Sequence, residues 1–145
     1  MTSSASPSAG PAGDATSPGT ASAASHAAVV ALPPPTTQRN WDAVRRQAAQ
    51  RMVAANPAAT YPGAPPEILL AIPVLEIELN GDGSVRRIEV LRRPGQALDT
   101  VQIAMEAVRR GAPYGDVSRL PRPWKFVETF LFDDARRFKP RSLDL

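Results

Sequence analysis

The chain has 145 residues, of which 43% are hydrophobic and 21% are charged, with a net charge of +3 and no cysteine. The lack of cysteine excludes a disulfide framework, a thiolate zinc site and a cysteine nucleophile. The single histidine, His26, lies in a low-complexity N-terminal segment, which argues against histidine-based catalysis and a histidine-rich metal site.

The N-terminal segment, residues 1–37, consists mostly of small residues. Of these 37 residues, 31 are Ala, Ser, Thr, Pro or Gly, and Asp14 carries the only charge. Such a segment buries too little apolar surface to offset the entropy lost on ordering, so we expect a disordered tail or linker. No run reaches the roughly 20 apolar residues of a membrane helix, and the N-terminus has no secretory signal pattern. Any anchor or signal would be missing from this chain.

A helix is predicted within residues 38–57. Its apolar side chains recur at spacings of three and four between Trp41 and Ala55. Asn40 is a suitable N-cap, and the pair Asn56-Pro57 ends the helix, because the residue before proline avoids helical geometry.

A β-hairpin is predicted over residues 74–91. Leu75, Ile77 and Leu79 alternate with glutamates, and Asn80–Gly83 provides residues that tolerate a tight turn. The return strand, from Val85 to Leu91, breaks the strict alternation of apolar and polar residues. A bulge at Arg86-Arg87 restores it. The expected pairs are Leu79 with Val85, Ile77 with Ile88, Leu75 with Val90 and Glu78 with Arg87.

A second amphipathic helix is expected from Leu98 to Arg110, and a last strand from Trp124 to Asp133. That strand carries apolar residues on both faces, so we expect the first helix to cover its second face. The order of elements predicts an α+β fold, with a helix on a three-stranded antiparallel sheet and an extra N-terminal helix. We expect this domain at 58–134 and a C-terminal tail at 135–145.

Catalytic signals are weak. Glu76 and Glu78 fit a solvated strand face, and Asp133-Asp134 fits a polar turn better than a cation site. Ser84, Ser118 and Ser142 have no histidine near them in sequence that could activate them. We therefore expect a protein that is not an enzyme and that uses no cofactor.

Several short motifs follow one another between residues 58 and 134. They are Tyr61-Pro62, VLEIELNGDGSVRRIEVL (Val74–Leu91), Pro94-Gly95 with Leu98-Asp99, Ala107–Arg110, Ala112-Pro113-Tyr114 and FVETFLF (Phe126–Phe132). In this order the segment resembles the C-terminal domain of the TonB/TolA family. The resemblance implies a hairpin, a helix and a third strand in a periplasmic domain that takes part in energy transduction or transport across the cell envelope.

The resemblance also implies a protein partner in the envelope, such as an outer-membrane receptor, held by β-strand addition. The implied contact residues are Tyr61, Pro62, Lys125, Val127, Thr129 and Leu131, with the final strand as the exposed edge. A homodimer through that strand is a further implication. The chain has no membrane helix or long spacer, so a tethered or soluble TonB-like protein fits as well.

A different class of function is a small basic nucleic-acid-binding protein. It would use the hairpin arginines Arg86, Arg87, Arg92 and Arg93 and would bind more weakly as salt rises. The arginine doublets are spread evenly along the chain rather than clustered, which makes nucleic acid the less favoured partner.

Overall fold

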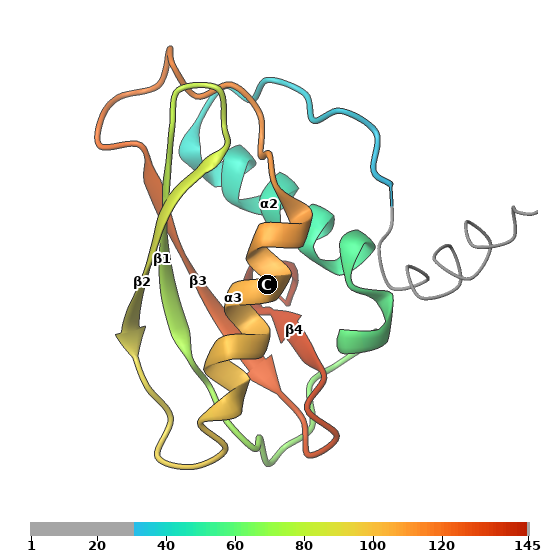
Figure 1. Cartoon of the computed structure of the whole chain (residues 1–145). Helices are drawn as coiled ribbons and strands as arrows, with labels where there is room; N and C mark the ends of the chain where they lie inside the picture. The colour runs from blue at the N-terminus through green and yellow to red at the C-terminus, as the bar shows by residue number, and fades with distance from the viewer. Residues whose placement is uncertain (1–30, 145) are drawn as a thin grey trace, which may run out of the picture.

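The computed structural model describes residues 31–144, which form an α+β fold of two helices and one antiparallel sheet (Figure 1). The predicted disorder of residues 1–30 lies outside the described residues. The strands are β1 (Val74–Leu79), β2 (Val85–Arg92), β3 (Lys125–Phe132) and β4 (Phe138–Pro140), in the order β2-β1-β3-β4. The helices are α2 (Trp41–Ala55) and α3 (Asp99–Gly111), with short 3-10 turns η1 (Pro57–Ala59) and η2 (Arg141–Leu143). The sheet thus has four strands where the sequence predicted three.

The first helix begins and ends where its capping residues predict. The side chain of Asn40 accepts a hydrogen bond from the Ala43 N–H at 2.8 Å. At the other end, the buried Asn56 side chain donates to the Met52 carbonyl at 2.7 Å and to the Ala107 carbonyl at 3.1 Å. Because Ala107 belongs to α3, this one amide ties the end of α2 to the second helix.

The hairpin has the predicted register. Leu75 pairs with Val90, Ile77 with Ile88 and Leu79 with Val85, and the register shifts between Glu78 and Leu79, which confirms the bulge. Glu78 lies opposite Arg87, and their charged groups are 3.2 Å apart. The bulge therefore keeps the apolar residues of both strands on one face.

Both helices contribute to a single core on one face of the sheet. That core joins Val44 and Met52 of α2 to residues of α3 and to Leu75, Ile77 and Phe130 of the sheet. The expectation that α2 covers the second face of the last strand is wrong. On that outer face Val127 is 37% exposed, because α2 packs beside α3 instead (Figure 1).

Residues 135–144 belong to the folded domain, which corrects the expected C-terminal tail. Strand β4 pairs Phe138 with Phe132 and Pro140 with Phe130. The Phe138 ring is fully buried, with its centroid 5.1 Å from that of Phe130 and 5.5 Å from that of Phe132. A strand of three residues is too short to show alternation in the sequence, so only its pairing with β3 reveals it.

The end of the predicted tail is also in contact with the domain. Residues 31–37 have no regular secondary structure, but the Thr36 hydroxyl donates to the Gln47 side chain of α2 at 2.9 Å. Arg51, one turn further along α2, donates to the Pro33 carbonyl at 2.7 Å. These extended residues are thus held against α2 by hydrogen bonds and need no hydrophobic core of their own.

We predict that Gly83 is required for stability. Its φ is +89°, and a Cβ there would lie 2.1 Å from the backbone oxygen of Gly115. We expect Gly83→Ala to lower the free energy of unfolding by more than about 2 kcal/mol, measured by urea denaturation. The matched control is Gly95→Ala, where an added Cβ meets nothing within 4 Å. Equal stability of the two variants would contradict the close approach of the hairpin to Gly115.

Candidate functional site

Strand β3 is paired on both sides over only part of its length. On one side, β1 pairs with residues 125–129 of β3, and a bridge between Ala71 and Phe132 continues this ladder; on the other side, β4 pairs with residues 130–132 only. The β4 ladder ends at Pro140, after which the chain turns into η2. Residues 125–129, which we call the open half of β3, therefore have a neighbouring strand on one side alone among the described residues.

The alternation of the ladder shows where the backbone groups of the open half point. The Leu79 N–H donates to the Trp124 carbonyl at 2.8 Å, and the Phe130 N–H donates to the Pro73 carbonyl at 3.0 Å. In this stretch the N–H and carbonyl groups of even-numbered residues thus point toward β1, and those of odd-numbered residues point away from it.

Two of the outward N–H groups have local acceptors. The Lys125 N–H donates to the Pro123 carbonyl at 3.1 Å, and the Thr129 N–H donates to the Glu128 carboxylate at 3.0 Å. In residues 31–144, neither the N–H nor the carbonyl of Val127 has a hydrogen-bond partner. Val127 therefore offers the donor and acceptor pair that an added strand needs.

Two cavities lie along the open half of β3. Val127 and Arg45 line both of them. The smaller, of about 200 Å³, also touches Glu128, Thr129, Arg141 and Ser142. The larger, of about 410 Å³, extends past Lys125 to Trp41 of α2 and to the loop at Pro121–Pro123. Together they form a groove between β3 and α2.

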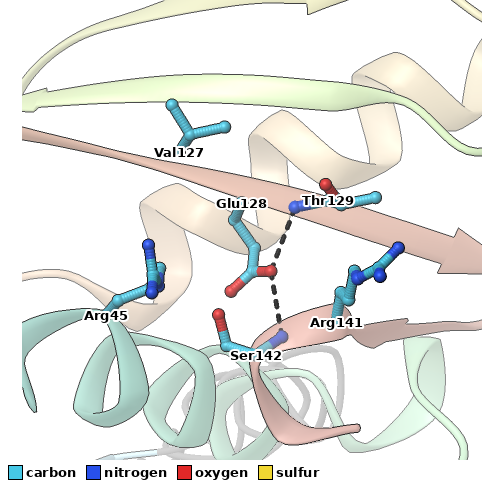
Figure 2. Close-up of a pocket in the computed structure, with 6 residues that line it drawn as sticks. All are labelled: Arg45, Val127, Glu128, Thr129, Arg141 and Ser142. Carbon is cyan, nitrogen blue, oxygen red and sulfur yellow. Dashed lines mark hydrogen bonds between the residues drawn. The ribbon is translucent and has the colours of Figure 1, made fainter. Parts of the chain in front are cut away.

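Glu128 is the charged residue buried at this groove, with 2% of its surface exposed. Its Oε2 accepts hydrogen bonds from the N–H groups of Thr129 at 3.0 Å and Ser142 at 3.3 Å (Figure 2). Its Oε1 is buried and has no hydrogen-bond partner among the described residues. Burial raises the pKa of the Glu128 carboxyl, against the opposing effect of these hydrogen bonds and of Arg45.

Three of the residues predicted to contact a partner lie on the open half. Lys125 is exposed, with its Nζ 3.3 Å from the Glu76 carboxylate, and Val127 and Thr129 line the groove. Leu131 does not join them, because it is buried and paired with Lys139 of β4. The prediction that the last strand is an edge along its whole length is wrong for residues 130–132.

Tyr61 and Pro62 line a different cavity, with Asp133 and Asp134. Tyr61 is buried, and its hydroxyl donates to the Leu131 carbonyl at 2.9 Å. Burial is also the main cause that raises the pKa of this phenol. The structure thus gives Tyr61 a contact inside the domain and does not bring it to the open half of β3.

Arg86, Arg87 and Arg92 lie on β2, an outer strand of the sheet, and Arg93 follows its last residue. Arg86 and Arg87 both approach the Glu78 carboxylate, at 3.7 and 3.2 Å, while Arg92 and Arg93 are exposed at the end of the strand. Nucleic-acid binding through these side chains stays a prediction.

Sequence reasoning missed Glu128 and the residues that surround it. The available signal was a gap in an apolar row, since Phe126, Phe130 and Phe132 share one face of β3 and a glutamate stands between them. Arg45, Arg141 and Ser142 gave no such signal, because they come from separate elements that meet only in the folded chain.

Residues 31–144 contain no group of three or more acidic or histidine side chains placed to hold a metal ion. Among the same residues, neither helix has the length and apolar character needed to span a bilayer. No family model, curated protein or solved structure matches this chain. The site is therefore interpreted from its own geometry.

We predict that Glu128→Gln stabilises the domain at neutral pH. Because the pKa of folded Glu128 is raised, the folded state binds this proton more tightly than the unfolded chain does. The contribution of Glu128 to wild-type stability is therefore greatest below the ordinary glutamate pKa of 4.5 and is lost as the pH rises through the folded value. The cationic side chains that line the same cavity are Arg45 of α2 and Arg141 of η2.

Glutamine resembles the protonated acid, so the variant should not lose this stability as the pH rises. Urea unfolding over a series of pH values should show a stability difference that grows from acidic toward neutral pH. A difference that is the same at every pH would contradict the raised pKa.

Proposed function

We propose that this domain is a non-catalytic interaction module that holds an extended segment of a partner protein as an added strand on the open half of β3. The observation that carries the proposal is the backbone of Val127, whose N–H and carbonyl have no partner within residues 31–144 and lie at a groove. Main-chain hydrogen bonds at such an edge supply affinity, and pockets for alternate side chains supply specificity.

The other edge of the sheet is less suited to strand addition. Strand β2 carries Arg86, Arg87, Glu89 and Arg92, which are exposed, and a bulge next to the turn. Charged side chains and bulges are the features by which proteins protect edges from pairing. The open half of β3 has one cationic side chain, Lys125, already paired with Glu76. This contrast favours β3 as the binding edge.

The order of hairpin, helix and third strand at 58–134 supports a relation to the C-terminal domain of the TonB/TolA family. On this proposal the module works in the periplasm and binds a protein of the cell envelope, such as an outer-membrane receptor. The resemblance supports the periplasmic role, and the open edge supports the mode of binding.

The test is a proline at the centre of the open half. Val127→Pro removes the N–H and, because that group does not face β1, it should leave the sheet intact. The control Val127→Thr keeps the N–H and the branched side chain. Full-length chains would be used to select peptides from a random 12-residue phage library, and binding of the selected peptides would be measured by fluorescence anisotropy.

We expect Val127→Pro to weaken binding by about tenfold or more, because it loses a main-chain hydrogen bond and the ring intrudes on the groove. Val127→Thr should bind within about twofold of the wild type. Selected peptides that bind the folded proline variant as tightly as the wild type would overturn the proposal.

A further inference from the structure

The smaller cavity lies where one side chain of an added strand would enter the domain. Side chains of a strand point alternately to the two faces of a sheet. Glu128 and Phe126 point toward the core face, since they pair with the buried Leu75 and Ile77 of β1. A partner residue beside Glu128 that points to the same face would meet the cavity between β3, α2 and η2.

The cavity offers both a hydrogen-bond acceptor and hydrogen-bond donors. Glu128 provides a buried oxygen, Oε1, that accepts no hydrogen bond in the described residues. Arg45 and Arg141 stand on either side of it (Figure 2), and their guanidinium groups only donate. Arg45 is paired at 3.1 Å with Asp42 on the surface, whereas Arg141 has no ion-pair partner among residues 31–144. A complementary group must therefore both donate to Glu128 and accept from an arginine.

Most side chains meet only part of this requirement. A lysine or arginine would add a third positive charge beside Arg45 and Arg141, and an aspartate or glutamate would face the buried carboxyl of Glu128. An aliphatic side chain would leave Oε1 without a donor, which costs free energy in a buried site. A carboxamide has two N–H donors and a carbonyl acceptor on one planar group.

We propose that the cavity beside Glu128 takes the carboxamide of an asparagine or glutamine carried by the partner segment that adds to β3. The amide N–H donates to Oε1 of Glu128, and its carbonyl accepts from Arg45 or Arg141. The cavity volume of about 200 Å³ has room for one such side chain and not for a separate ligand of drug size. Arg45, whose side chain is 40% exposed, turns outward to admit it. This inference rests on the proposed function and specifies the partner sequence.

The experiment compares peptides selected by the wild type and by Glu128→Gln, both as full-length chains, from the same random 12-residue library. Glutamine can keep its oxygen toward the N–H groups of Thr129 and Ser142, which places its NH₂ where Oε1 stood. The variant thus presents a donor to the cavity in place of an acceptor. Thermal unfolding followed by circular dichroism checks that both chains are folded.

We expect wild-type peptides to carry Asn or Gln at one fixed position, and replacement of that residue by Ala to weaken binding about tenfold. The variant should lose this preference and favour Asp or Glu at the same position. Two outcomes would overturn the carboxamide inference and leave strand addition intact. In both, the peptides depend on the Val127 N–H. Either they carry Lys or Arg at the fixed position, or they have no position that responds to Glu128→Gln. Absence of any peptide weakened by Val127→Pro would overturn the proposed function and this inference together.

Discussion

The pairing of β3 with two unequal neighbours is the constraint on which the candidate site depends. Strand β1 runs along residues 125–129 and a preceding extended segment continues the pairing to Phe132, whereas β4 reaches only Phe130–Phe132. Proline has no N–H to extend a ladder, and the chain turns into η2 after Pro140. One strand thereby holds both the centre of the sheet and a short open edge.

The buried face of β3 explains why the open half stays in place without a second strand. Phe126 and Phe130 enter the same core as Leu75 and Ile77 of β1, so burial of apolar side chains fixes the strand from one face. Glu128 is the exception on this face. Its position brings a carboxyl into low-dielectric surroundings, where an unpaired oxygen is costly for stability. This cost, at a residue that lines a groove, is what the proposed role of Glu128 in binding a partner would account for.

Much of the local structure follows from residue patterns. The cap at Asn40, the end of α2 before Asn56-Pro57, the hairpin register and the bulge at Arg86-Arg87 all match the sequence predictions, because each depends on neighbours within a few residues. The strand β4 and the packing of residues 31–37 on α2 escaped prediction. Each depends on a surface that exists only when distant elements have come together.

The sequence by itself determined which residues face inward on β1 and β2, where α2 starts and stops, and that Lys125, Val127 and Thr129 share one side of a strand. The tertiary structure alone decided that this strand is open at Val127 and closed at Leu131, because β4 returns from the C-terminus to pair there. It alone decided that Tyr61 bonds inside the domain and that Arg45, Glu128 and Arg141 line one cavity. The alternation of apolar and polar residues along a strand predicts which side chains share a face. Whether the strand is an edge depends on its neighbouring strands, which no local pattern specifies.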